Sequence, residues 1–473
     1  MIMILTSESA ASAESEPNSS QPRKRFSRRS LLRASATAVA ALSGCPAWGG
    51  SDGRESRPGA ADETPPETET PATAGETRTA PNTRNGTATG TSTPTPTASP
   101  ADPFEQHVYV TDSQLAAVED KIEAEKDPWH SAYRELLPSA KGALASEMSS
   151  VTDDGAPRWD DPHQFGYEES RHDYRTALDM TTAVRDLALA YRFTGENRYA
   201  EGCIDRIYHW CLNEETRMKP VAKNVWAGAS IALWITIPDL WYGASLLRGH
   251  AYWQEKTGPD LEASFEDWVR SFVDSMEEPS YYQYNNIWAW RIQTIASAAD
   301  YLDDQEMFDR AIELWRAERN WKDYKRRRDG KGALKKELER TDGLEYHVYG
   351  IKALTMTAEI ARHRGINLYG YNAPTDPGEG STLKKLYRFM IPYLKAPERW
   401  KWGVGNNGIS SYERNGFASL YELAYSHWQE PAFREVIELV GRPVHDGRLL
   451  GWTTLTHGNL FALEDVRTPT SDE

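Results

Sequence analysis

Hydrophobic residues recur every three to four positions through most of the chain after residue 103, which is the spacing of a helix with one buried face. Val184, Leu187 and Phe193 mark such a face on a helix that we expect to stop at Thr194. The same period predicts further helices over about 199–212, 226–247, 262–276, 287–302, 305–320, 343–364, 381–395 and 411–427.

The connections between these helices are short and polar, so consecutive helices should pack antiparallel. No convincing set of alternating strands is present. About a dozen helices in sequential hairpins predict an all-α fold, an α/α toroid that is a complete or incomplete barrel. We assign this domain to residues 103–473, a length of about 370 residues that is feasible for one helical toroid.

The first 44 residues have the pattern of an export signal. A basic stretch that contains Arg28 and Arg29 precedes a short apolar run from Ala34 to Leu42. This pattern resembles a twin-arginine signal, and the sequence that ends at Cys45 resembles a lipobox, in which the cysteine carries the lipid anchor. The alternative is a disordered basic tail with a chance cysteine.

Residues 45–102 are rich in Thr, Pro, Ser and Gly, and such a segment cannot bury enough apolar surface to fold. We expect it to be a disordered stalk. The order of signal, anchor, stalk and domain predicts an extracellular protein held by lipid at the outer face of the cell membrane.

Charge and cysteine content exclude other classes. The chain has 54 Lys and Arg against 70 Asp and Glu, a net charge of −16, which disfavours a nucleic-acid partner. No apolar run reaches the roughly 18–20 residues of a membrane-spanning helix. Cys203 and Cys211 lie eight residues apart on one predicted helix, about 12 Å, which is too far for a disulfide. Two thiols are too few for a structural zinc site, and we expect no metal or other cofactor.

Aromatic residues are abundant, with 17 Trp, 23 Tyr and 11 Phe. Trp and Tyr line sugar-binding clefts because their faces are apolar and their edges form hydrogen bonds. For any single Trp, a place in the helical core is the better expectation. The set as a whole favours a carbohydrate cleft.

Two segments carry candidate chemistry. Asn285 and Asn286 stand at the start of the helix over 287–302; one of them can cap the helix and leave the other amide free to bind a carboxylate near the helix N-terminus. In the second segment, Asp342 and Glu345 have capping-box spacing, which starts a helix at about Gly343.

That second helix is apolar on nearly all sides, as expected of a buried inner helix. Arg340 falls in the loop before it, Tyr346 lies in its first turn, and Tyr346 and Tyr349 share an arc that could face a cleft. His347 lies on the opposite, core side. It is either a core histidine bonded to the backbone or a reserve acid/base group.

Together these blocks resemble the alginate lyase family, especially the mannuronate lyases with an α/α barrel. The resemblance spans about residues 129–395. It rests on VRDLALAYRFTGENRYA, on NNIWAW with DQEMFDRAIELW, and on ELERTDGLEYHVYGIKAL with AEIARHRGINL.

The resemblance implies roles for individual residues. Asn286, Arg340 and Tyr346 match the family's catalytic Asn, Arg and Tyr, with one fewer residue between the last two, and Ile287 takes the place of the family's His. His347 is the reserve candidate for a second catalytic group. Substrate-binding roles are expected for Asn285, Trp288, Trp290, Arg291 and Tyr349.

Such a lyase removes the C5 proton of a uronate and expels the C4 oxygen, so the site must neutralise the neighbouring carboxylate and supply a base and an acid. Arg340 and the Asn286 amide are suitable donors. An arginine and a helix N-terminus should let Tyr346 ionise more readily than usual. In mannuronate the proton and the leaving oxygen lie on one face of the ring, so one tyrosine suffices, and the loss of the His at 287 favours this substrate.

Two other functions stay open on the sequence. An α/α-barrel glycoside hydrolase needs two carboxylates about 5–10 Å apart across a cleft, for which Glu337, Glu339, Asp303 and Asp304 are available. A non-catalytic lipoprotein that binds uronates is the second. An anionic polysaccharide is the expected partner under both the lyase and the binding-protein hypotheses.

Overall fold

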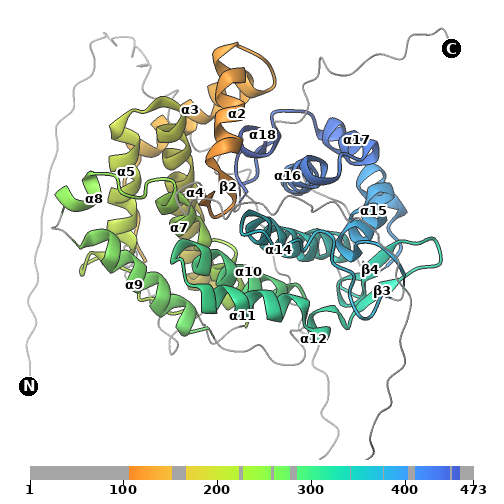
Figure 1. The fold of residues 1–473 in the computed structure, drawn as a ribbon. Coiled ribbons are helices and arrows are strands. Elements are labelled where there is room, and N and C mark those ends of the chain that lie inside the picture. The colour runs from red at the N-terminus through yellow and green to blue at the C-terminus, as the bar shows by residue number, and fades with distance from the viewer. Residues whose placement is uncertain are drawn as a thin grey trace, which may run out of the picture. The chain divides into compact units, whose positions relative to one another are not determined.

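Figure 1 shows a computed structural model of the chain, which describes residues 106–151, 167–222, 227–256, 260–276, 285–340, 342–376, 378–402, 411–447 and 450–458. The predicted signal, the anchor residue Cys45 and the predicted stalk lie outside the described residues. The boundary expected between stalk and domain lies outside them as well.

The described residues form a ring of antiparallel helices (Figure 1). The longer helices are α2 (Asp112–Glu123), α3 (Trp129–Ala145), α4 (Tyr167–Thr194), α5 (Asn197–Ile207), α6 (Ala227–Trp234), α7 (Pro238–Ser245), α9 (Leu261–Asp274), α10 (Asn286–Tyr301), α11 (Gln305–Arg316), α14 (Gly343–His363), α15 (Thr382–Lys395), α16 (Ser411–Trp428) and α17 (Pro431–Val440). Short helical segments are η2 (Tyr208–Leu212), α8 (Tyr252–Glu255), α12 (Glu318–Trp321), α13 (Lys335–Leu338), η4 (Pro397–Arg399) and α18 (Thr453–Thr456).

The helices form two layers, as an α/α toroid requires. Helices α7, α10 and α14 are buried around almost their whole circumference, and each packs against neighbours of both layers. Helices α5, α9, α11 and α17 bury one face and expose the other, which places them in the outer layer. These two layers confirm the expected all-α toroid.

Local details differ from the prediction. The single helix expected over 226–247 is two helices, because Pro238 begins α7 and cannot donate the backbone hydrogen bond that would continue α6. Two small antiparallel hairpins, β1 (Gln106–His107) with β2 (Val110–Thr111) and β3 (Tyr324–Arg326) with β4 (Gly332–Leu334), were not predicted. They are too short for strand periodicity to be visible.

The two cysteines of the domain are buried and free. Residues 184–200, which carry no candidate chemistry in the sequence, contribute a buried ionic cluster to the scaffold. Arg185 of α4 donates to Asp186 and, at 2.9 Å, to Asp239 of α7. Lys352 of α14 pairs with Asp446 near the C-terminal end of the described chain. The first pair ties α4 to α7, and the second ties α14 to the segment around Asp446.

Much of the aromatic content fills the core. Within the described ranges, eight tryptophans are less than 2% exposed: Trp129, Trp210, Trp241, Trp253, Trp288, Trp290, Trp315 and Trp321. Among the described residues, no helix is both long and apolar enough to cross a membrane.

Candidate active site

The N-terminus of α10 is built by the two adjacent asparagines. The Asn285 side chain caps the helix by accepting a hydrogen bond from the Ile287 N–H at 3.0 Å. Asn286 is the first helical residue and is 2% exposed, and Ile287 is 9% exposed. The expected division of labour is therefore present, with Asn285 as the cap and the Asn286 amide released from capping.

The Asn286 amide is held by a carboxylate of the protein. Glu337 of α13 accepts from the Asn286 backbone N–H at 2.6 Å, and both of its oxygens lie 3.1 Å from Asn286 Nδ2. From that nitrogen the two oxygens subtend an angle far smaller than the roughly 120° between the two N–H bonds of an amide. One N–H is thus shared by the carboxylate oxygens, and the second points elsewhere.

This arrangement corrects the expectation of a helix N-terminus open to a substrate carboxylate, because Glu337 already occupies it. Glu337 is 1% exposed. Burial raises the pKa of its carboxyl group, against the opposing effects of the nearby Arg340 charge and the hydrogen bonds from Asn286. The same contacts make Glu337 unsuitable as one of a hydrolase's two catalytic carboxylates, since it is sealed behind Asn286.

Arg340 and Tyr346 are stacked on each other. The Cζ atom of Arg340 lies 3.4 Å from the centre of the Tyr346 ring, a cation–π arrangement. Both side chains are partly exposed. Burial raises the pKa of the Tyr346 phenol, and the Arg340 charge lowers it by a smaller amount. The expectation that this phenol ionises more readily than usual is wrong for the free protein, because the desolvation effect exceeds the effect of the guanidinium.

The three side chains with expected catalytic roles are linked through Glu337 and Arg340. Asn286 contacts Glu337, the charge of Arg340 acts on both Glu337 and Tyr346, and Arg340 covers the Tyr346 ring. They come from α10, from the loop after α13 and from α14. Gly350 lets β4 lie close to α14, since a Cβ there would come within 2.8 Å of Leu334 Cδ1.

The start of α14 is as predicted, at Gly343, although the Asp342 side chain makes no capping hydrogen bond. His347, the reserve acid/base candidate, is fully buried and its Nε2 accepts from the Leu334 N–H at 3.1 Å. Burial lowers its pKa to about 3. It is a core histidine that anchors β4 to α14, so the structure contradicts a catalytic role for it.

The residues expected to bind substrate are divided. Trp288 and Trp290 are each 1% exposed, so the structure places them in the core and not on a cleft surface. Tyr349 is partly exposed, and its ring centre lies 6.4 Å from that of Tyr346 and 6.2 Å from that of Trp290. It is the member of this group that the structure brings to the Tyr346 ring.

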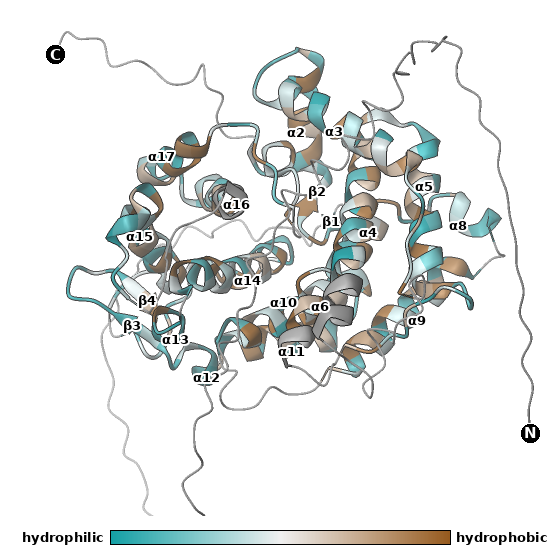
Figure 2. Ribbon diagram, turned by 180° about the vertical axis from the view of Figure 1, so that it is seen from behind, coloured by the Kyte–Doolittle hydropathy of each residue, from teal (hydrophilic) through white to brown (hydrophobic). Residues whose placement is uncertain are grey.

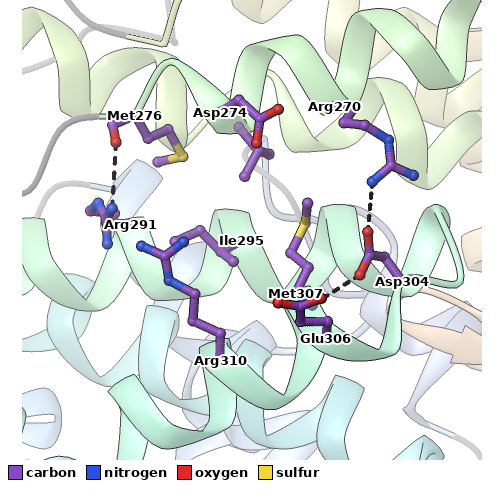
Figure 3. Close-up of a pocket in the computed structure, with 10 residues that line it drawn as sticks. Arg270, Asp274, Met276, Arg291, Ile295, Asp304, Glu306, Met307 and Arg310 are labelled. Atoms are coloured by element: carbon purple, nitrogen blue, oxygen red, sulfur yellow. Dashed lines mark hydrogen bonds and ion pairs between the residues drawn. The ribbon is translucent and has the colours of Figure 1, made fainter.

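Arg291 lies at a different pocket, between α9, α10 and α11 (Figure 3). The pocket measures about 300 Å³. Figure 3 shows Arg291 directed toward Met276, whose carbonyl oxygen it contacts at 3.4 Å, and shows Arg270 paired with Asp304. Three arginines and three acidic residues line this pocket, so their charges balance. Arg291 is therefore not part of the Asn286–Tyr346 group.

Glu337 is the residue that sequence reasoning missed as a partner of Asn286. It was considered only as a hydrolase carboxylate, and no local pattern connects residues 51 positions apart. In the described ranges, no group of three or more His, Cys, Asp or Glu side chains is arranged to hold a metal ion.

Comparison with solved structures gives the same class of fold. An alginate lyase from Bacteroides ovatus superimposes with a TM-score of 0.60 at 19% identity, covering 74% of this chain and 98% of that one. Alginate lyase A1-III from Sphingomonas species A1 superimposes with a TM-score of 0.53 at 17% identity, covering 76% and 97%. A variant of the latter enzyme was solved with a bound tetrasaccharide. The class is the α/α toroid of these lyases.

The sequence itself supplies the family. The sequence model of the alginate lyase family matches residues 91–400, and the chain belongs to that family. It is a polysaccharide lyase, which is a carbon–oxygen lyase. A search of curated proteins found no match.

Proposed function

We propose that this protein cleaves an acidic polyuronate by β-elimination, with alginate rich in mannuronate as the substrate. The observation that supports this most is the stacked pair of Arg340 and Tyr346 beside the Asn286 amide. These groups supply a fixed positive charge, a phenol and an amide N–H on neighbouring segments, which is what binding and deprotonating one uronate unit requires. The tetrasaccharide complex of the Sphingomonas enzyme supports an oligosaccharide ligand for a protein of this fold.

In the proposed reaction, Arg340 and the second N–H of Asn286 bind the uronate carboxylate. Their positive charge and hydrogen bond stabilise the electron density that moves onto the carboxylate when the C5 proton leaves, which is the usual task of preorganised donors. Glu337 acts on this step indirectly, because its contact with Asn286 fixes the direction of the remaining amide N–H.

Tyr346 is the proposed acid and base. As phenolate it removes the C5 proton, a C4–C5 double bond forms, and the C4–O bond to the leaving sugar breaks as the phenol returns the proton to that oxygen. One group can perform both transfers only where the proton and the leaving oxygen lie on the same face of the ring, as in mannuronate. The apolar Ile287 beside Asn286 supports this single-tyrosine route.

The test is incubation of the protein with polymannuronate, polyguluronate and other polyuronates, followed by near-ultraviolet absorbance of unsaturated uronate products. We expect absorbance with polymannuronate first. Reducing ends without that absorbance would indicate a hydrolase, and binding without any product would indicate a capture protein.

Tyr346→Phe removes one oxygen and keeps the stacked ring, so we expect a loss of activity of about 100- to 10,000-fold, the range typical of a lost acid/base group. Tyr371→Phe is the matched control, because that phenol, outside the group described above, donates to the Arg316 carbonyl. Equal activity in the Tyr346→Phe variant and the wild type would show that Tyr346 is not the acid/base.

We further propose that the chain is exported by its twin-arginine-type signal and held at the outer face of the cell membrane by lipid on Cys45. Cys45→Ala should release the protein from membranes into the medium. Retention of that variant in the membrane fraction would contradict a lipid anchor at this residue.

A further inference from the structure

A short basic segment stands out in this acidic chain. Residues 322–336 contain eight Lys or Arg and two Asp, a net charge of +6, whereas the whole chain carries −16. The structure folds the segment into the β3–β4 hairpin and the start of α13. The hairpin lies at the rim of the ring beside α15 (Figure 1), and its turn is strongly hydrophilic (Figure 2).

The charge of this hairpin is presented to solvent. The four consecutive residues Lys325, Arg326, Arg327 and Arg328 are all exposed. Some of the basic side chains have acidic partners, since Arg326 lies 3.9 Å from Asp376 and Arg327 lies 3.5 Å from Asp329. These partners offset only part of the charge, so the hairpin keeps a positive field of the kind that attracts anionic polymers.

Aromatic rings adjoin the basic side chains. The Arg327 guanidinium lies 5.5 Å from the Phe389 ring centre and 5.7 Å from that of Trp402, and its Nη1 lies 3.5 Å from the Tyr393 hydroxyl. Tyr393 and Trp402 are partly exposed, and their ring centres are 5.3 Å apart. Arginines next to exposed aromatic faces suit a charged sugar, because the guanidinium binds its carboxylate and the ring binds its apolar face.

This surface is connected to the candidate active site. The ring centre of Trp400 lies 5.0 Å from that of Trp402 and 5.9 Å from that of His347, the residue that follows Tyr346. The hairpin itself reaches the same turn, where Leu334 donates to His347. These contacts place the hairpin and Trp402 next to the first turn of α14, which also carries Tyr346.

We propose that the β3–β4 hairpin, with Tyr393 and Trp402, binds an anionic polysaccharide at sugar units beyond the one that is cleaved. The proposal deepens the proposed function and rests on it for the identity of the polymer. The contribution is made by charge and stacking, so it should weaken as salt screens the charges. Its main effect should be on the affinity for long chains and not on the chemical step.

The test uses the full chain with Lys325→Glu and Arg328→Glu combined. Arg134→Glu with Lys141→Glu is the control, because it makes the same charge change at exposed positions of α3. Binding of polymannuronate is measured in low and high salt, with the Tyr346→Phe substitution added to both to slow cleavage. We expect the hairpin variant to bind about tenfold more weakly in low salt, with a smaller difference in high salt, and the control to bind like the parent.

The second measurement is the steady-state kinetics of cleavage, made on the hairpin and control variants without the Tyr346→Phe substitution. The hairpin variant should have a raised KM for long polymannuronate and an unchanged kcat, and it should cleave the shortest accepted oligomers normally. Equal weakening by the hairpin and control pairs would overturn the proposal, since the effect would then come from net charge.

Two further outcomes test whether the hairpin binds a membrane instead of a polysaccharide, and whether the protein binds the polysaccharide without cleaving it. Loss of binding to phosphatidylglycerol vesicles with full binding of polymannuronate would identify the hairpin as a membrane contact and overturn the proposal. Hairpin-dependent, salt-sensitive binding of polymannuronate without any unsaturated product would support the surface while removing the proposed lyase reaction.

Discussion

Two buried glutamates, Glu337 of α13 beside the first turn of α14 and Glu359 near the last turn of α14, have pKa values shifted in opposite directions. Near the first turn of α14, burial raises the pKa of Glu337, which has amide donors but, among the described residues, no ion pair. In its last turns, the pKa of Glu359 lies well below its usual value although burial acts against this, because Arg362, His363, His457 and Tyr369 surround it. Equal burial therefore gives opposite shifts.

This difference in pKa shift distinguishes a structural contact at the C-terminal end of α14, which we call the anchor, from the candidate active site at its N-terminal end. The Glu359 carboxylate is paired within the protein, and its contact with His457 joins α14 to the end of the described chain. At the other end, Arg340 stacks on Tyr346 instead of forming an ion pair with Glu337. A guanidinium stacked on a phenol ring can still donate hydrogen bonds to a substrate carboxylate. A guanidinium in a buried ion pair can do so only if that ion pair breaks.

The two glutamates also make the stability of the protein depend on pH in opposite directions. A raised pKa means that the contribution of Glu337 to stability is present in acid and lost as pH rises through its folded pKa. A lowered pKa means that the contribution of Glu359 is present above its unfolded pKa and lost as pH falls. Acid should therefore weaken the anchor end of α14 first.

The largest effect is expected from breaking the anchor. Glu359→Gln removes the charge that Arg362 and the other donors share, which should lower the free energy of unfolding by about 3 kcal/mol, at the lower end for a buried pair because Arg362 is exposed. Urea unfolding measures this, and activity per folded molecule should stay near that of the wild type. Glu435→Gln, at an exposed pair with Lys395, is the control and should cost at most about 1 kcal/mol. Similar stability for both variants would contradict the anchor.

Removing the cation at the site end should affect catalysis instead. Arg340→Ala deletes the group proposed to hold the uronate carboxylate, so kcat/KM should fall by about 100- to 1,000-fold. The melting temperature should change little, since Arg340 is partly exposed. A large loss of melting temperature with activity retained would show that Arg340 is structural.

A smaller effect is expected from Glu337→Gln, which keeps the shape but replaces the carboxylate that orients Asn286. We expect kcat to fall about tenfold, roughly the worth of one hydrogen bond to a charged group. If Glu337 acts through Asn286, adding Glu337→Gln to Asn286→Ala should cost nothing more. Additive losses in this double-mutant cycle would show that the two residues act separately.

The smallest expected change concerns the pH profile. Because burial raises the pKa of Tyr346, the phenolate fraction, and with it kcat/KM, should rise with pH on the alkaline side. Arg340 lowers that pKa, so the rising limb of the residual activity of Arg340→Ala should move to higher pH. A limb that stays in place would mean that another group is titrating.

Features that depend on residues close together in the sequence were predicted better than features that depend on contacts between distant segments. The start of α14 at Gly343 was predicted, and so was a capping role for one of the two asparagines, because both depend on residues within one turn. The break before Pro238 was missed although the proline itself signals it. The phenol of Tyr346 was expected to ionise readily because the neighbouring arginine is visible in the sequence, whereas the burial that outweighs it is not.

By itself, the sequence determined the helical class, the approximate helix positions and the family, since hydrophobic period and motif order are local properties of the chain. The tertiary structure alone decided how Asn286 meets Glu337, that His347 is sealed in the core, and that Arg340 lies on the Tyr346 ring. Burial and contacts between distant segments set the pKa values and orientations of these groups, and both arise only once the toroid has closed around α14.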